Sequence, residues 1–122
     1  MVLAPGADGW DRYCRRLNSV VPLAGAPGGV QYLAFYDGSA SHLENYEEKC
    51  ALAVSNDLRR WESRSVRGPA LRSPHASTSL RYLDAKLARG TWHLFYEYAR
   101  ADGSHDMRVT TCDAAALAGL LA

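Results

Sequence analysis

The sequence of 122 residues has little that would tie it to a charged partner or to a membrane. Its net charge is only +1, which gives no field to attract nucleic acid or an anionic membrane. No apolar run approaches the ~20 residues of a membrane-spanning helix. Residues 1–4 lead directly to Pro5-Gly6 and then to charge, unlike a signal peptide. We therefore expect neither a nucleic-acid nor a membrane partner.

Cysteine is also scarce, and the familiar chemical motifs are missing. Cys14, Cys50 and Cys112 make an odd count without a CxxC spacing, which is typical of reduced thiols in a cytoplasmic protein. The sequence has no nucleophile elbow, phosphate-binding loop, dinucleotide fingerprint or HExxH motif. No three metal-ligating residues follow a recognisable spacing. We expect no cofactor and no metal.

What the sequence does contain is an internal repeat. Residues 32–38 align with residues 92–98, and residues 49–55 align with residues 106–112. Each copy holds three segments rich in aromatic and β-branched residues, as β-strands are. A repeat of this length is typical of consecutive blades of a β-propeller. The sequence therefore predicts an all-β fold, a partial propeller of two antiparallel blades of the four-stranded type with a short C-terminal helix.

We expect a single domain over residues 1–122, with blade one at about 17–66 and blade two at about 79–112. The expected strands are residues 17–23, 30–37, 49–55 and 61–66 in blade one, and 79–87, 91–99 and 105–112 in blade two. Blade two lacks a fourth strand, because the alanine-rich segment at about 113–121 is helix-like, with Asp113 as its N-cap.

The loops that connect these antiparallel strands are expected to lie at two opposite ends of the sheets. Alternate loops of antiparallel strands fall at the same end, so segments 10–16, 38–48, 67–78 and 100–104 share one end. Loops on a rigid scaffold are where binding groups concentrate. Trp10 and Tyr46 lie at this end and are better stacking platforms for a ligand than the strand tryptophans, which suit the core.

The acids at this end allow two interpretations. Glu47 and Glu48 could form the carboxyl pair of a glycoside hydrolase, whose pKa values separate when the groups are close, or belong to a solvated acidic loop. Asp37 and Glu97 occupy equivalent positions in the two copies. They could face a shared site or cap the loops that follow them.

Basic and polar residues complete the candidate set. Asn18 and Arg81 lie on the first strand of each copy, where sugar ligands would sit, although Arg81 could instead pair with Asp84 or Glu97. His105, beside Asp106, could be an oriented imidazole, a metal ligand or a turn histidine. The candidate catalytic residues are Asp37, Glu47, Glu48 and Glu97. The candidate substrate-binding residues are Asn18, Tyr46, His75, Arg81, Arg100, His105 and Asp106.

Two stretches carry a resemblance to a known group of proteins. Residues 31–38 (QYLAFYDG) and 51–62 (ALAVSNDLRRWE) resemble the blade signature of five-bladed β-propeller glycoside hydrolases, the group of families 43, 62 and 32. The resemblance covers residues 16–110, most of the chain. Its S-x-D-L-x-x-W element is moderately specific for the fold and weakly specific for a substrate.

The resemblance implies a sugar site at the mouth of a propeller funnel, with two Asp and one Glu from different blades as the catalytic set. The family's N-terminal Asp motif matches no position here. The chain resembles the last two blades of a longer protein. It could be a fragment, a subunit that self-associates through its open blade edges, or a small sandwich of two sheets. The expected function is hydrolysis or binding of a carbohydrate; the alternative is a non-catalytic binding or assembly module.

Overall fold

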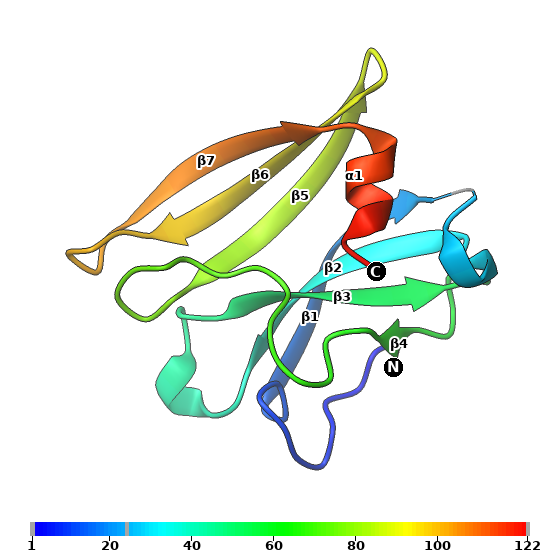
Figure 1. Ribbon diagram of the computed structural model, residues 1–122. Helices are drawn as coiled ribbons and strands as arrows, with labels where there is room; N and C mark the ends of the chain where they lie inside the picture. Colours follow the sequence, from blue (N-terminus) through cyan, green and yellow to red (C-terminus); the bar gives the residue numbers. More distant parts are fainter. Residues whose placement is uncertain (1, 24, 122) are drawn as a thin grey trace.

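The computed structural model describes residues 2–23 and 25–121, which form two antiparallel sheets and one short helix (Figure 1). Sheet A contains, in spatial and chain order, β1 (Cys14–Pro22), β2 (Tyr32–Ser39), β3 (Lys49–Ser55) and β4 (Glu62–Ser63). Sheet B contains β5 (Leu80–Ala88), β6 (Thr91–Ala99) and β7 (His105–Cys112). The helix α1 spans Ala114–Gly119, and the 3-10 turns η1 and η2 span Pro27–Gly29 and His42–Glu44. The predicted all-β class is confirmed.

The strand boundaries follow the prediction in part. β3, β6 and β7 have the expected bounds, whereas β1 begins at Cys14, earlier than expected, because Arg15 and Arg16 pair with the end of β2. The fourth strand was predicted too long, since β4 has only two residues. Its pairing stops where the Leu52 N–H donates to the side chain of Ser65 rather than to a backbone carbonyl.

Sheet A is buried on both faces, as the apolar residues on both sides of β2 predict. One face, with Leu33 and Phe35, packs in a cluster that includes Leu83 and Leu94 of sheet B. The opposite face, with Ala34 and other small residues, is covered by the N-terminal segment. The main core therefore lies between the two sheets.

Gly38 shows how closely the N-terminal segment is packed on sheet A. A Cβ atom at this position would lie 2.8 Å from the Trp10 ring and 2.8 Å from the Asp11 Cβ. The Trp10 Nε1–H donates to the Ser65 carbonyl at 2.6 Å, and the Tyr36 hydroxyl donates to Asp11 at 2.7 Å. The ring of Trp10 stacks on that of Tyr36, with centroids 6.4 Å apart. Trp10, expected to be a platform for a ligand, is instead a packing residue.

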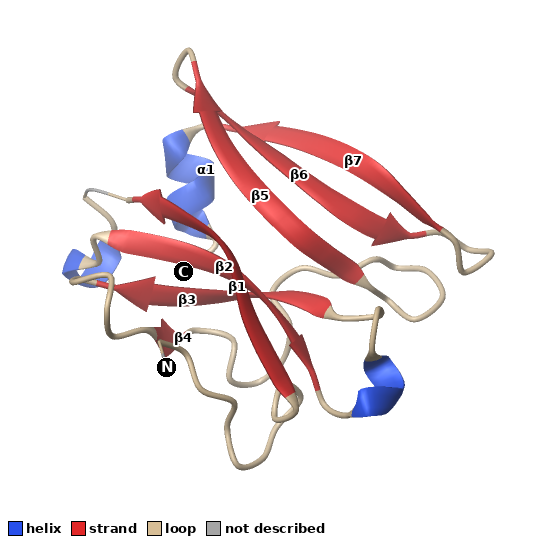
Figure 2. Ribbon diagram, turned by 180° about the vertical axis from the view of Figure 1, so that it is seen from behind, coloured by secondary structure: helices blue, strands red, loops and turns tan. Residues whose placement is uncertain are grey.

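Helix α1 descends from the end of β7 into the space between the sheets (Figures 1 and 2). Asp113 is its N-cap, as predicted, since its carboxylate accepts from the Ala116 N–H at 2.7 Å. Leu117 has no exposed surface and belongs to the core between the sheets. The helix therefore covers part of that core.

The longer loops gather at one end of the molecule. In Figure 1 the loop between β2 and β3 that contains η2 (residues 40–48, the η2 loop), the segment before β5 and the β6–β7 hairpin lie together at the left. The Glu47 carboxylate accepts a hydrogen bond from the Ser77 hydroxyl and lies in hydrogen-bond contact with His105 Nε2, and these contacts connect the three segments. The sorting of the loops into two ends is thus reproduced, and most of the candidate residues lie at the loop-rich end.

Candidate functional site

The first strand of each sheet is bulged at the loop-rich end. The pairing of β1 with β2 shifts between Leu17 and Ser19, and that of β5 with β6 shifts between Arg81 and Asp84. Bulges redirect side chains and are enriched beside functional sites. Here the β5 bulge places Tyr82 at a φ of 56° and turns its N–H towards sheet A.

Asp37 accepts a hydrogen bond from the Tyr82 N–H and thereby joins the two sheets. Each of its carboxylate oxygens lies 3.2 Å from the Tyr82 nitrogen, and Oδ2 also accepts from Arg16 Nη2 at 2.7 Å. Burial raises the pKa of Asp37 above 3.8, and Arg16 and the Tyr82 N–H oppose this shift. Because Asp37 has no exposed surface, it acts within the protein and presents nothing to a ligand in this arrangement.

Glu48 lies between two guanidinium groups. Its Oε1 is 4.0 Å from Arg16 Nη2, and its Oε2 is 3.5 Å from Arg81 Nη1. The residue is only 6% exposed, and Oε2 has no hydrogen-bond partner among the described residues. Glu48 is therefore a buried carboxylate with an unused acceptor.

Arg81 links this carboxylate to the second sheet and to the η2 loop. Its Nε donates to Glu97 Oε2 at 2.8 Å, and its Nη1 donates to the Tyr46 carbonyl. The Arg81–Glu97 pair that the sequence left open is therefore formed. Tyr46 contributes its backbone, and its side chain is exposed, as a platform for a ligand must be.

Tyr82 lies between the two arginines. The guanidinium carbon of Arg16 is 4.7 Å from the ring centroid, and that of Arg81 is 4.8 Å from it. Such cation–π contacts orient a guanidinium as well as attract it. The tyrosine is 39% exposed, so this arrangement reaches the surface.

We call Arg16, Asp37, Glu48, Arg81, Tyr82 and Glu97 the acid–arginine cluster. Three carboxylates against two guanidiniums give it a formal charge of −1 when all are ionised. Sequence reasoning found Asp37, Glu48, Arg81 and Glu97 but missed Arg16 and Tyr82. Arg16 could have been found, since it stands at the loop-rich end of β1, whereas the role of Tyr82 depends on the bulge.

Glu47 and His105 form a separate contact beside the cluster. Glu47 Oε2 lies 3.0 Å from His105 Nε2 and also accepts from the Ser77 hydroxyl. This contact ties the η2 loop to β7 and to the segment before β5. Asn18, by contrast, occupies the β1 bulge, and its buried Nδ2 has no hydrogen-bond partner among the described residues.

The remaining candidates lie at the rim. His75 and Arg100 line an open hollow of about 270 Å³ with Ala101, Asp102 and Arg108. The His75 ring meets the Tyr98 ring edge-on, with centroids 6.2 Å apart, and Asp106 lies 3.5 Å from Arg108. The candidates His75, Arg100 and Asp106 are therefore not part of the acid–arginine cluster.

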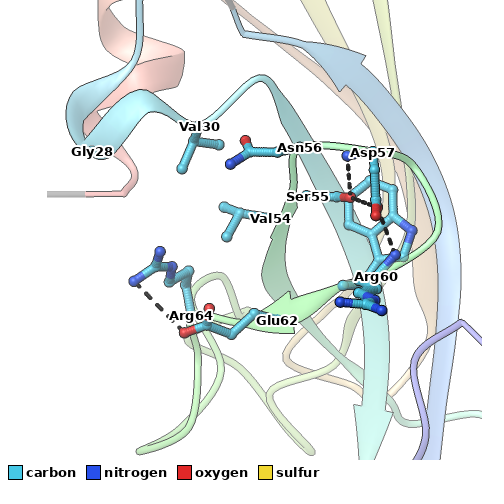
Figure 3. Close-up of a pocket in the computed structure, with 10 residues that line it drawn as sticks. Gly28, Val30, Val54, Ser55, Asn56, Asp57, Arg60, Glu62 and Arg64 are labelled. Atoms are coloured by element: carbon cyan, nitrogen blue, oxygen red, sulfur yellow. Dashed lines mark hydrogen bonds and ion pairs between the residues drawn. The ribbon is translucent and has the colours of Figure 1, made fainter.

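Another hollow, of about 350 Å³, lies at the opposite end, between the turn after β3 and η1 (Figure 3). Its most polar part is committed to the turn, because Asp57 accepts from the backbone of Arg59 and Arg60 at 2.8 Å. The S-x-D-L-x-x-W element thus builds a turn. No group of three His, Cys, Asp or Glu side chains that could hold a metal occurs among residues 2–23 and 25–121.

Comparison with family models, with curated proteins and with solved structures finds no match for this chain. The three cysteines are unpaired. No described helix has the length and apolar character needed to cross a membrane.

Proposed function

We propose that the chain binds a carbohydrate at the acid–arginine cluster, as two adjacent blades of a propeller similar in design to glycoside hydrolases. The observation that carries this proposal is the convergence of Glu48, Glu97 and two arginines around an exposed tyrosine at the loop-rich end. Alternating carboxylate acceptors and guanidinium donors suit the hydroxyl groups of a sugar. An exposed ring gives the sugar an apolar surface to pack on.

The arrangement of the sheets supports the propeller part of the proposal. Each sheet is a meander, and β5 packs against β1, β2 and β3. The Ala85 N–H on β5 donates to the Ser19 hydroxyl on β1 at 3.0 Å, which brings the first strands of the two sheets together. Neighbouring blades of a propeller would likewise bring their first strands together near the central axis, which is why we favour this arrangement.

Binding has better support than hydrolysis. Glycoside hydrolysis needs two carboxyl groups at the scissile bond, one of them protonated. Asp37, whose pKa is raised, has no exposed surface, and Glu97 is already paired with Arg81. Glu48, with its unused acceptor, is the residue we expect a sugar hydroxyl to reach when the exposed side chains around it move.

The proposal is tested by titrating the ¹⁵N-labelled chain with a panel of neutral mono- and disaccharides and following amide shifts. We expect shifts at residues 46–48, 81–82 and 97, and a loss of affinity of about tenfold or more in Glu48→Gln and Tyr82→Ala. Glu62→Gln and Arg60→Gln, at the opposite end, are the matched controls and should bind as the wild type does.

A panel in which no sugar shifts these amides, or binding that survives both cluster substitutions, would refute the proposal. Release of reducing ends by the wild type but not by Glu48→Gln would instead establish hydrolysis.

A further inference from the structure

The outer face of sheet B exposes apolar side chains on two neighbouring strands. Phe95 is 40% exposed, Val109 54% and Met107 66%. Phe95 pairs directly with Val109, so their side chains share one face, and Met107 joins them through its pairing with Glu97. Contiguous apolar patches of this kind mark interaction surfaces.

The same face is covered in the other copy of the repeat. Phe35 and Leu52 of sheet A pair with each other as Phe95 and Val109 do, and they are 0% and 2% exposed. They are buried because sheet B packs on them with Leu83 and Leu94. The face of sheet A that packs against another sheet is therefore matched in sheet B by a face that is exposed.

The charges on this bare face balance. Lys86 pairs with Asp84 at 3.3 Å, and both side chains are exposed. One positive and one negative group give no net repulsion when the face meets an identical one, and the two ion pairs can exchange partners across the contact.

A second copy could not cover this face with its sheet A. In the repeat, the surface of sheet A that would be required carries Ala34 and Tyr36, and it is already covered by Leu3 and Trp10 of its own chain. The remaining self-complementary arrangement places sheet B against sheet B across a two-fold axis, the commonest symmetry of homo-oligomers.

We infer that a second copy of this chain docks on the outer face of sheet B, with Phe95, Met107 and Val109 at the centre of the contact. This goes beyond the carbohydrate proposal and does not depend on it. Glu97 pairs with Met107 and is partly exposed beside it, so the second copy would border the acid–arginine cluster.

The experiment is sedimentation equilibrium of the wild type from about 1 μM to about 1 mM, a range that captures dimers of weak to moderate affinity. We expect the mass to reach that of two chains. Val109→Glu should weaken dimerisation by about 100-fold or more, because the new carboxylate would be buried without a partner. Val20→Glu is the matched control, since Val20 is an exposed strand valine of sheet A, and its mass should match that of the wild type.

The wild type alone gives a second measurement that no folding defect can obscure. Amide shifts of residues 93–97 and 107–111 should change with protein concentration, and those of residues 56–60 should not. A wild type that stays monomeric throughout would overturn the inference and leave a sheet of another polypeptide as the occupant. A dimer disrupted by Val20→Glu but not by Val109→Glu would overturn it as well.

Discussion

At the scale of the residue, the charged side chains at the loop-rich end mainly form contacts between the two sheets. Asp37 is buried and holds the bulged Tyr82 N–H of the other sheet, while Arg16 neutralises it. A buried carboxylate costs free energy unless its bonds compensate. The raised pKa of Asp37 indicates that burial outweighs those bonds.

This pKa predicts an unusual pH dependence. Between 3.8 and the raised pKa, the folded chain binds a proton at Asp37 that the unfolded chain has lost, so stability falls as pH rises through this window. Asp37→Asn removes this term. We expect the free energy of unfolding of the variant, relative to the wild type, to increase over the same window, measured by urea unfolding at a series of pH values.

Asp57→Asn is the control of opposite sign. The N–H groups of Arg60 and Arg59 lower the pKa of Asp57, so its contribution is present above 3.8 and lost as pH falls. A stability difference between Asp37→Asn and the wild type that does not vary with pH would contradict the prediction.

Which of these contacts the sequence predicts depends on how each contact arises. The repeat placed Asp37 and Glu97 at equivalent positions, and the loop sorting brought Glu48 and Arg81 to the same end. The sequence did not predict that Tyr82 lies between two arginines. This geometry depends on the β5 bulge, and no local pattern of residues predicts where that bulge occurs.

At the scale of the element, local signals defined most of the segments. β6 and β7 have the bounds that their aromatic and β-branched residues predict, and Asp113 caps α1 as its position before an alanine run predicts. β4 fell short, because Ser65 competes for the Leu52 N–H through its side chain. Such a competitor acts only after the chain has folded back on β3.

Helix α1 packs on the core chiefly through Leu117, its one buried residue, with Ala118 beside it. A helix of six residues is marginal by itself, so its docking depends on Leu117, which is fully buried. We expect Leu117→Ala to lower the free energy of unfolding by about 2–5 kcal/mol, the range for truncated core leucines. Chemical denaturation measures the loss.

Leu43→Ala is the comparison, because Leu43 is 83% exposed in η2 and should change stability by less than about 0.5 kcal/mol. Equal effects of the two substitutions would mean that α1 is not docked on the core.

At the scale of the whole molecule, one hydrophobic cluster unites both sheets and the helix. Leu33 of sheet A, Leu94 of sheet B and Leu117 of α1 belong to it. A core shared in this way leaves neither sheet able to bury its apolar face alone, and small proteins of this kind unfold in one cooperative transition.

The three tryptophans test this cooperativity. Trp10 and Trp61 pack on the far face of sheet A, and Trp92 packs in the cluster between the sheets. We expect Trp92→Phe, which leaves the first two as reporters, to show fluorescence and circular dichroism transitions with the same midpoint. The double variant Trp10→Phe/Trp61→Phe, which leaves Trp92, should behave likewise. Within either variant, midpoints that differ would show that the sheets unfold separately.

The sequence by itself determined the all-β class, the repeat, the bounds of β3, β6 and β7, and the gathering of the longer loops at one end. These follow from side-chain periodicity and turn residues, which act over a few neighbours. Only the tertiary structure decided that Asp37 is fully buried and that Arg16 and Tyr82 complete the cluster. It also decided that Phe95 is exposed, whereas the equivalent Phe35 is buried. Equivalent residues in a repeat have the same local pattern, but their burial depends on which surface packs against them.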